Sequence, residues 1–318
     1  MIKKIRFAII GTSDISPAHI KAIQRNNYAE VVYIYSRDFQ RAKEFANTYN
    51  IAPARTYEDI LMDKSIDAID IVTEPNRHAK LALAAIQKGK HVLIEKPLDF
   101  NIALAKEVTI AASKSPTITS VISQKRFDPK IKIIKRALDN KTIGNPYLAE
   151  VKLMWMRNRE YYEKGNGWRG REGNVLINQA IHWIDIALWF FGFPSKIRSS
   201  NIKVKKDIAC YDTAICCFEF PNNLLFNLVC STAVNKNEHE VFKIYGTKSV
   251  LTYGESLRFR NMRIDKLANL IMSPRTPLQC QIDSFINSII YNKPPEVSVI
   301  DAYNALIVVK SCEDDNKR

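Results

Sequence analysis

The fold of the first part of this chain follows from two stretches, DAIDIVTEPNRH (residues 67–78) and KGKHVLIEKPL (residues 88–98). Each contains a short apolar run with β-branched residues, a pattern typical of a buried strand. The residues between them have helical periodicity, and Gly89 is a suitable C-cap for that helix. A strand, a helix and a second strand in this order predict a βαβ unit with both strands parallel in one sheet.

The same alternation of strands and helices extends to both sides of these stretches. Ser16 and Pro17 are suitable for a helix start, with serine as the cap and proline at the first helical position. The expected elements are strands at residues 6–10, 31–35, 68–72, 91–94 and 117–122, and helices from Ser16, at 40–49 and at 78–88. Because such an alternation gives a parallel sheet covered on both faces, residues 1–123 are predicted to be an α/β domain with a Rossmann-type, doubly wound sheet.

The pattern changes after residue 123, where strands begin to follow one another directly. We expect helices at 130–139 and 174–191 and strands at 147–155, 212–220, 224–232, 240–245 and 249–252. Residues 124–318 are therefore predicted to form an α+β domain on a mostly antiparallel sheet. Two final helices, at 278–291 and 299–312, are candidates to pack back on the first domain, and residues 314–318 are expected to fray.

The composition is that of a folded protein. Of the 318 residues, 46% are hydrophobic and 25% are charged, which excludes a disordered chain, and the length fits two domains. No pair of cysteines has C-x-x-C spacing, so we expect no zinc site and no other metal. We interpret the cysteines as packed thiols in a reducing compartment. They are Cys210, Cys216, Cys217, Cys230, Cys280 and Cys312.

The net charge of +14, from 47 lysines and arginines against 33 acidic residues, favours anionic partners. The basic residues form only short clusters, at 130–136 and 203–206, without interleaved aromatics, which argues against nucleic acid and for an anionic small substrate. No apolar run is long enough for a membrane span, and the first residues lead into a strand instead of a signal peptide. We therefore expect no membrane partner and a cytoplasmic location.

The loop between the first strand and the first helix reads GTSDIS, residues 11–16. In this position a dinucleotide pyrophosphate would rest on helix N–H groups. Serine replaces the second and third glycines of the G-x-G-x-x-G fingerprint, so the loop by itself does not distinguish a nucleotide site from an ordinary turn. The candidate cofactor contacts here are Gly11, Thr12, Ser13, Asp14 and Ile15.

At the end of the second strand, Ser36 and Arg37 stand where NAD-binding domains usually have an acidic residue for the ribose hydroxyl. Arginine at this position can neutralise a 2′-phosphate, which indicates tolerance of NADP. The same side chain can also stack on adenine or be a solvated loop charge. We therefore expect NAD(P) as the cofactor, with the choice between NAD and NADP open.

The triplet Glu95-Lys96-Pro97 follows a strand and comes one helix and one strand after the turn TEPNRH, which begins at Thr73. With this combination the sequence resembles the Gfo/Idh/MocA family of NAD(P)-dependent oxidoreductases over almost its whole length. The turn is one residue shorter than the family's T-x-P-N-x-x-H. The resemblance implies a cis bond between Lys96 and Pro97. It also implies the cofactor contacts Thr73, Pro75, Asn76, His78, Glu95, Lys96 and Gln124.

Lys96 is the first of two candidate catalytic residues. An ammonium group at the carboxyl end of a parallel strand reaches the crevice in which an open α/β sheet binds its ligand. There Lys96 can hold the reacting hydroxyl and stabilise the developing alkoxide. Glu95 can accept a hydrogen bond from the nicotinamide ribose or orient Lys96. The alternative is a surface ion pair between the two residues.

The second candidate catalytic residue is His182, which shares one face of the long helix with Asn178, Asp185 and Trp189. The family places an N-x-x-x-H pair on this helix, with the histidine beside the substrate hydroxyl and the nicotinamide. The resemblance therefore implies that His182 accepts the hydroxyl proton, and Asp185, one turn on, can orient it. The alternative is a histidine that packs between helix and sheet.

Residues 155–170 read WMRNREYYEKGNGWRG, and NQAIHWID follows shortly after. This stretch resembles the family's subgroup of UDP-N-acetylhexosamine and UDP-N-acetylhexosaminuronate 3-dehydrogenases, which carry W-x-R-x-x-x-Y-Y, W-R-G and N-Q-x-I-H. The loop between Gly170 and Val175 is shorter than in these relatives, which leaves the sugar open, and Lys125 replaces asparagine in a Q-N-R segment. The implied substrate contacts are Lys96, Arg126, Arg157, Tyr161, Trp168, Arg169, Asn178 and His182.

These residues predict an NAD(P)-dependent sugar dehydrogenase that transfers hydride from a ring hydroxyl to the nicotinamide. The expected hydroxyl is at C3 of a UDP-linked N-acetylated hexose or hexuronic acid. Three alternatives remain: another family reaction, such as keto-sugar reduction or inositol oxidation, a dinucleotide-binding sensor without turnover, or a nucleic-acid-binding protein. The resemblance also implies a homodimer or homotetramer, formed through the sheet of the second domain.

Overall fold

The computed structural model describes residues 3–260, 262–263 and 275–315. The chain divides into two units. The first unit contains Met1–Gln124 and Arg275–Tyr303, and the second contains Lys125–Pro274 and Asn304–Arg318. The chain therefore returns to the first unit before its end, and the division falls inside the last helix, α12 (Val299–Asp315).

The first unit is built on a parallel sheet. Among the described residues this sheet has six strands in the order β3-β2-β1-β4-β5-β6, and each neighbouring pair is parallel. The strands are β1 (Ile5–Ile10), β2 (Ala29–Tyr35), β3 (Ala52–Ala54), β4 (Ala68–Ile71), β5 (His91–Ile94) and β6 (Thr119–Val121). The strand order reverses beside β1, as in a Rossmann fold, so the predicted doubly wound sheet is confirmed.

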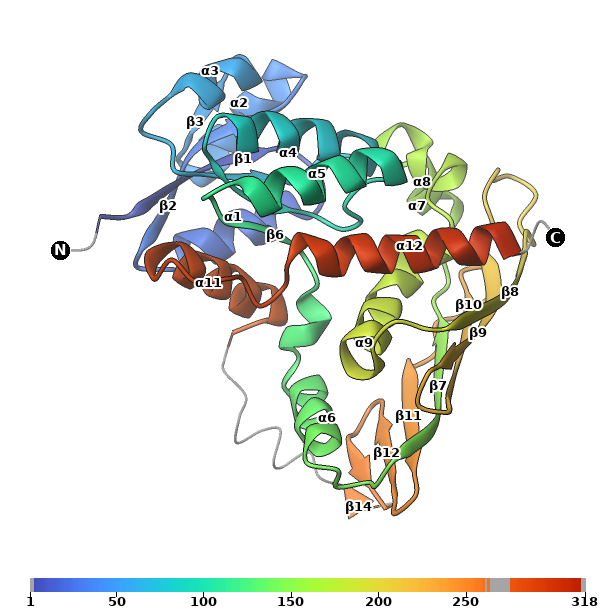
Figure 1. The fold of residues 1–318 in the computed structure, drawn as a ribbon. Helices are drawn as coiled ribbons and strands as arrows, with labels where there is room; N and C mark the ends of the chain where they lie inside the picture. The colour runs from blue at the N-terminus through green and yellow to red at the C-terminus, as the bar shows by residue number, and fades with distance from the viewer. Residues whose placement is uncertain (1–2, 261, 264–274, 316–318) are drawn as a thin grey trace. The chain divides into compact units, whose positions relative to one another are not determined.

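Helices connect these strands. They are α1 (Ser16–Gln24), α2 (Phe39–Tyr49), α3 (Tyr57–Met62), α4 (His78–Gln87) and α5 (Ile102–Lys114). One further helix of this unit, α11 (Pro277–Ile290), follows the strands of the second unit in the sequence. Because parallel crossovers are right-handed and the two halves of the sheet grow in opposite directions from β1, α1 and α4 cover opposite faces. Figure 1 shows α11 beside α1 and α5 beside α4. The periodicity did not predict β3, α3 or α5.

The late helix α11 packs on the first unit. Its Phe285 ring contacts Phe7 of β1 edge to face, with the ring centroids 6.2 Å apart. Asn26, just after α1, donates from Nδ2 to Asp283 Oδ1 of α11 at 2.6 Å. The rings of Phe7 and Phe285 are fully buried. Their contact joins residues more than 250 positions apart in the sequence in one hydrophobic core.

The second unit is built on a mostly antiparallel sheet, as predicted. Among the described residues it has eight strands in the order β14-β13-β12-β11-β7-β10-β9-β8, and β7 and β10 are its parallel pair. The strands are β7 (Pro146–Met154), β8 (Lys196–Ile202), β9 (Thr213–Phe220), β10 (Leu224–Ser231), β11 (Val241–Gly246), β12 (Val250–Tyr253), β13 (Arg258–Phe259) and β14 (Met262–Arg263).

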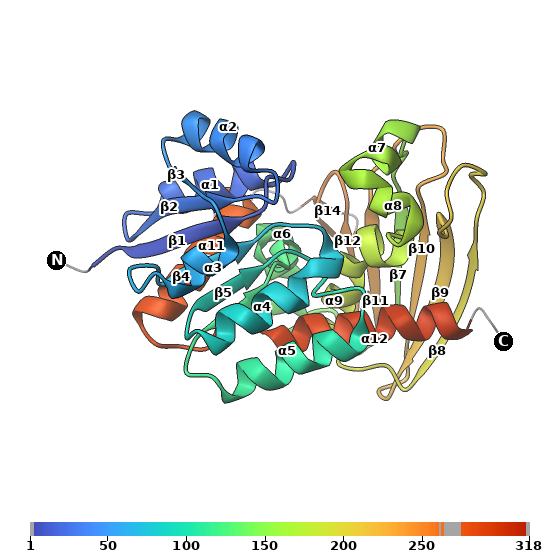
Figure 2. The same cartoon turned by 90° about the horizontal axis from the view of Figure 1, so that it is seen from above.

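One face of this sheet is covered by aromatic residues of a long helix. Besides the end of α12, the described α-helices of the unit are α6 (Pro129–Asp139), α7 (Arg159–Glu163), α8 (Trp168–Arg171) and α9 (Ile181–Phe191). Trp183 of α9 packs on Phe242 of β11 with the ring centroids 4.9 Å apart. The opposite face leaves Ile215 and Leu225 about half exposed, at 52% and 48%. Figure 2 shows α7 and α8 side by side.

The helix predicted at 174–191 is not one α-helix. A π-helical turn, Leu176–Ala180, precedes α9. Asn174 caps this segment, because its Oδ1 accepts the N–H groups of Leu176 and Ile177, both at 3.0 Å. A π turn holds more residues than an α turn, so the 3.6-residue spacing assumed between Asn178 and the residues of α9 does not apply there.

The predicted fraying from residue 314 is wrong for Asp314 and Asp315, which belong to α12. Asp315 Oδ2 accepts the Ser199 N–H of β8 at 2.8 Å, which holds the helix end on the sheet. Residues 316–318 lie outside the described residues. The six cysteines are all free thiols, and Cys216, Cys230 and Cys312 are buried. In the parts of the chain described here, no helix is both long and apolar enough to cross a membrane.

Gly11→Ala is expected to destabilise the protein by about 2 kcal/mol or more, because Gly11 has φ +123° and a Cβ there would lie 2.7 Å from the Val72 carbonyl oxygen. Gly89→Ala is the matched control. Gly89 also has a positive φ, +69°, but a Cβ there meets nothing within 4 Å, so we expect a loss of about 1 kcal/mol. Thermal or urea unfolding measures both, and equal losses would contradict the close approach of β1 and β4.

Candidate active site

The loop after β1 is held by serine side chains. Ser16 Oγ donates to the Gly11 carbonyl at 3.1 Å and accepts the Ser13 N–H at 2.9 Å. The helix that follows, α1, starts without a side-chain cap and has proline in its first turn. An uncapped helix N-terminus after the first strand favours an anion, because its N–H groups and the helix dipole both point there. Ser16, which replaces a fingerprint glycine, thus shapes the loop.

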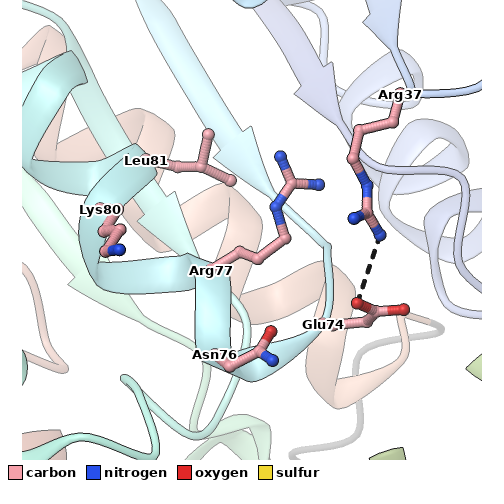
Figure 3. A pocket seen from close by; sticks show the side chains of 6 residues that line it. All are labelled: Arg37, Glu74, Asn76, Arg77, Lys80 and Leu81. Carbon is pink, nitrogen blue, oxygen red and sulfur yellow. Dashed lines mark hydrogen bonds and ion pairs between the residues drawn. The ribbon is translucent and has the colours of Figure 1, made fainter. Parts of the chain in front are cut away.

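Beside this loop, a pocket of about 390 Å³ lies between the end of β2 and the start of α4 (Figure 3). The guanidinium groups of Arg37 and Arg77 point toward the same region, and Arg37 Nη2 lies 3.4 Å from Glu74 Oε2. Burial and the neighbouring charge of Arg37 lower the pKa of Arg77. The lining residues are Arg37, Glu74, Asn76, Arg77, Lys80 and Leu81. Three cations against one carboxylate make this pocket suitable for an anionic group.

Arg37 and Asn76 were predicted from the sequence as cofactor contacts, whereas Arg77 and Lys80 were not. The signal for them was available, because both follow Asn76 in the TEPNRH turn and the first turn of α4, and helix residues three apart lie on one face. Ser36 lies next to this region, and its Oγ accepts from Thr12 Oγ1 at 3.4 Å. The structure therefore brings the ends of β1, β2 and β4 together at one edge of the sheet.

A buried histidine connects two carboxylates at the same edge. His19 of α1 contacts Asp70 Oδ2 through Nδ1 at 2.8 Å and Glu95 Oε1 through Nε2 at 3.0 Å. The His19 and Asp70 side chains are completely buried, and the Glu95 side chain is 13% exposed. The sequence patterns did not indicate His19 or Asp70 as site residues. An aspartate inside the otherwise apolar strand AIDI was the signal, because a buried charge needs a partner.

The Glu95-Lys96-Pro97 turn is held from both sides. Glu95 Oε2 accepts the Lys96 N–H at 2.9 Å, and the Lys96–Pro97 peptide is cis, as the resemblance implied. His78, which is fully buried, lies with Nδ1 2.8 Å from the Pro97 carbonyl and Nε2 3.0 Å from the Thr73 carbonyl. Burial lowers the pKa of His78. His78 therefore joins the turn after β4 to the turn after β5, and Lys96 is presented beside both.

In the second unit, Tyr161 of α7 connects the predicted substrate residues. Its hydroxyl oxygen accepts from Asn178 Nδ2 and from Gln179 Nε2, both at 2.7 Å. These two bonds use both acceptor positions of the oxygen, so the hydroxyl hydrogen is left as a donor. Both amides belong to the π-helical turn, which brings adjacent side chains onto one hydroxyl. Gln179 was not predicted as a site residue.

Two arginines stack on the same tyrosine. The guanidinium carbons of Arg157 and Arg169 lie 5.0 and 5.2 Å from the centroid of the Tyr161 ring. Arg169 also lies 4.5 Å from the centroid of the Trp168 ring. Arg157 Nε is buried, and the described residues offer it no hydrogen-bond acceptor. The structure thus brings Arg157, Tyr161, Trp168, Arg169 and Asn178 into one cluster, which we call the arginine–tyrosine cluster.

Arg126, which was also predicted as a substrate contact, forms a buried ion pair with Asp185. Its Nε and Nη2 donate to the two Asp185 carboxylate oxygens at 2.8 and 2.6 Å, and each side chain is 6% exposed. Its guanidinium carbon also lies 5.4 Å from the Trp189 ring centroid. The residue predicted to orient His182 is therefore engaged by Arg126. His182 itself is partly exposed, although its neighbours Ile181 and Trp183 are buried.

Lys125, the lysine that departs from the Q-N-R pattern, also has partners within the second unit. Lys125 Nζ lies 2.7 Å from Glu240 Oε1 and 4.2 Å from the Trp183 ring centroid. Trp183 Nε1 donates to the other oxygen of Glu240 at 3.1 Å. Lys125 and Arg126, on the 3₁₀ turn Gln124–Phe127, therefore both hold α9. No group of three or more His, Cys, Asp or Glu residues in the described ranges is arranged to hold a metal ion.

Two protein-family models match most of the chain. Residues 5–123 match the model described as "Oxidoreductase family, NAD-binding Rossmann fold", and residues 131–252 match the "GFO/IDH/MocA C-terminal domain" model. The chain belongs to the Gfo/Idh/MocA family. It is therefore an oxidoreductase whose first unit is an NAD-binding Rossmann domain, and the sequence-based recognition of the family is confirmed.

Individual relatives are distant. The chain is 26% identical to the "Uncharacterized oxidoreductase YrbE" of Bacillus subtilis, over 78% of this chain and 73% of the relative. It is 21% identical to myo-inositol 2-dehydrogenase of Thermotoga maritima, over 96% and 94%. Among solved structures, the WlbA dehydrogenase of Bordetella pertussis in complex with NADH and UDP-GlcNAcA superposes with a TM-score of 0.91, at 22% identity, over 99% of this chain and 96% of that chain.

The residues at the carboxyl edge of the first sheet fit a dinucleotide. Gly11 permits an approach to Val72 that any side chain would block, and the uncapped start of α1 can accept a pyrophosphate. The cationic pocket of Arg37 and Arg77 lies where the second strand ends, on the adenosine side of such a site. Glu95 presents a partly exposed carboxylate at the end of β5.

Proposed function

We propose that this oxidoreductase oxidises a ring hydroxyl, at C3, of a UDP-linked N-acetylated hexose or hexuronic acid. The arginine–tyrosine cluster carries this proposal, because it combines two cations, two aromatic faces and one hydroxyl donor. Guanidinium groups bind phosphates and carboxylates, and aromatic rings bind the faces of sugars. The likeness to the WlbA fold, whose solved complex contains UDP-GlcNAcA, supports the same substrate class.

Each catalytic role falls to a residue whose surroundings suit it. Lys96 holds the reacting hydroxyl and stabilises the alkoxide, since the turn that carries it is fixed by Glu95 and His78. His182 accepts the hydroxyl proton, because imidazole is a suitable base near neutral pH. The bound dinucleotide supplies the hydride acceptor. Arg126 and Lys125 act as positioning residues for α9, on which His182 lies. Arg126 forms a buried pair with Asp185 of α9, and the partly buried pair of Lys125 and Glu240 contacts Trp183 of α9.

The free thiols and the second sheet support two further proposals. We propose a cytoplasmic location, because cysteines that are thiols and not disulfides fit a reducing compartment. We also propose a homodimer or homotetramer, with the half-exposed face of the second sheet at Ile215 and Leu225 as the contact.

Lys96→Ala and His182→Ala are each expected to lower kcat by about 10²–10⁴, the usual effect of removing a positioned acid–base group. Binding of NADH, measured by fluorescence, should persist in both variants. The matched controls are Lys88→Ala and His239→Ala, because both residues are exposed and lie outside the proposed site. Near wild-type turnover in either site variant would remove that residue from the mechanism.

Arg37→Ala and Arg77→Ala are each expected to weaken NADPH binding about tenfold, because each removes a cation from the pocket at the adenosine end. The affinity for NADH should change by less than about twofold. Titrations of both nucleotides into wild type, the two variants and the exposed control Arg25→Ala measure this. If Arg37→Ala leaves NADPH binding unchanged, Arg37 is a solvated charge.

UDP-N-acetylglucosamine or its uronic acid should raise the melting temperature in the presence of dinucleotide, whereas free N-acetylglucosamine and inositol should not. A neutral ligand cannot form charge-assisted hydrogen bonds with the partly exposed guanidinium groups of Arg157 and Arg169, and each lost contact costs about 1–3 kcal/mol. Arg169→Ala should abolish the shift and leave dinucleotide binding intact. The control is Arg159→Ala on α7, whose side chain is 78% exposed.

Glucose 6-phosphate belongs in the same ligand panel, because the chain is 28% identical, over 72% of its length and 68% of the relative, to glucose-6-phosphate 3-dehydrogenase of Bacillus subtilis. Equal stabilisation by inositol or a free sugar would refute the nucleotide-sugar proposal. If glucose 6-phosphate stabilises the protein and the UDP-sugars do not, the substrate is a sugar phosphate and not a UDP-sugar.

A further inference from the structure

The contact between His19, Asp70 and Glu95 requires more protons than a neutral imidazole carries. A neutral ring has one N–H and one acceptor nitrogen, whereas ionised carboxylates only accept. Here both ring nitrogens lie within hydrogen-bond distance of a carboxylate oxygen, at 2.8 and 3.0 Å. An imidazolium satisfies both contacts, and a neutral ring would place a lone pair against one of the carboxylates.

The electrostatics of the site favour the same protonation state. Burial by itself would lower the pKa of His19, but the charge of Asp70 and the hydrogen bonds to both carboxylates raise it to about 10. Burial would raise the pKa of Glu95, but the hydrogen bond and charge of His19, together with Lys96 and His78, hold it below its usual range. His19 of α1, His78 of α4 and Lys96 in the turn after β5 thus favour the ionised form of Glu95. Asp70 of β4 favours the charged form of His19.

Glu95 is held at both of its oxygens. Oε1 contacts His19, and Oε2 accepts the main-chain N–H of Lys96. A rotation of the carboxylate would therefore break a bond on one side or the other. The other oxygen of Asp70, Oδ1, is buried and finds no hydrogen-bond partner among the described residues, so Asp70 depends on His19 for compensation.

Taking the role of Lys96 from the proposed function, we propose that His19 is a positioning residue, whose imidazolium keeps Glu95 ionised and fixes the main chain that presents Lys96. His19 touches neither the substrate nor the reacting atoms, since its side chain is completely buried. Its effect passes through Glu95, which stays an acceptor for a dinucleotide hydroxyl across the neutral range. The group of His19, Asp70 and Glu95 then carries a net charge of −1, opposite to that of Lys96.

The protonation state can be measured on the wild-type protein without substrate or cofactor. The chain has five histidines, so ¹⁵N-histidine spectra can be assigned with five single variants. At about pH 8, where an ordinary histidine is neutral, both ring nitrogens of His19 should be protonated. A neutral His19 ring at this pH would overturn the proposal, whatever the variants below do.

The positioning role is tested by NADH affinity as a function of pH. In His19→Gln the largely buried Glu95 loses its imidazolium partner, so burial raises its pKa and the carboxyl becomes neutral as the pH falls. We expect NADH to bind about tenfold more weakly at pH 6 than at pH 8.5 in this variant, against less than about twofold in wild type. His91→Gln is the control, because His91 begins the same strand at its other end, where Nδ1 accepts the Ile118 N–H.

A loss of affinity that is equal at all pH values would show a merely structural role and overturn the proposal, as would unchanged binding in a folded His19→Gln. If the variant does not fold, the histidine spectrum of the wild type decides. Neither measurement uses a sugar, so failure of the UDP-sugar proposal in the melting experiment leaves the assignment of His19 standing.

Discussion

Three charged groups buried at one edge of a parallel sheet determine much of this site. Asp70 lies in a strand whose residues are all buried, and an isolated carboxylate there would cost several kcal/mol. His19 on α1 compensates the charge of Asp70 and also contacts Glu95. These two contacts fix the first helix relative to the fourth strand and to the end of the fifth strand, and thereby the positions of Glu95 and of the Lys96 main chain. The main chain that carries Lys96, the proposed catalytic cation, is thus held by the same contacts that compensate the buried charge.

In the second unit the buried carboxylate of Asp185 is compensated by an arginine, Arg126. The bidentate pair of Arg126 and Asp185 connects the first residues of the unit to α9, and Lys125 and Glu240 add a second link beside Trp183. Removing one partner of such a buried pair usually costs about 3–5 kcal/mol, because the other charge is left without compensation. The role of Asp185 is therefore to hold α9 in position through Arg126. The partly exposed His182 keeps its place because the residues around it are fixed.

The sequence was informative where a pattern is long or chemically distinctive. The alternation of apolar strands and helices predicted the parallel sheet, and the Glu95-Lys96-Pro97 triplet predicted the family. Short elements without such patterns were missed: β3 has three residues, α3 has six, and α3 depends on a local capping box between Thr56 and Asp59. The 13-residue helix α5 was missed as well. The partners of Arg126 and His19 were also missed, because pairs separated by about 50 to 60 residues depend on tertiary contacts that no local periodicity encodes.

The arginine–tyrosine cluster restricts the kind of ligand it can bind, because the cluster offers hydrogen-bond donors and hardly any acceptors. Tyr161 accepts from two amides and can offer a neighbouring ligand only its hydrogen, and the guanidinium groups beside it have donors and no acceptors. A ligand that binds here must therefore present oxygens that accept, such as those of phosphate, carboxylate or an acetyl carbonyl. A polyol presents hydroxyls, which can accept as well, but it leaves the two positive charges without compensation. An anionic, acceptor-rich sugar derivative satisfies both requirements, and the N-acetyl and diphosphate groups of a UDP-sugar supply such oxygens.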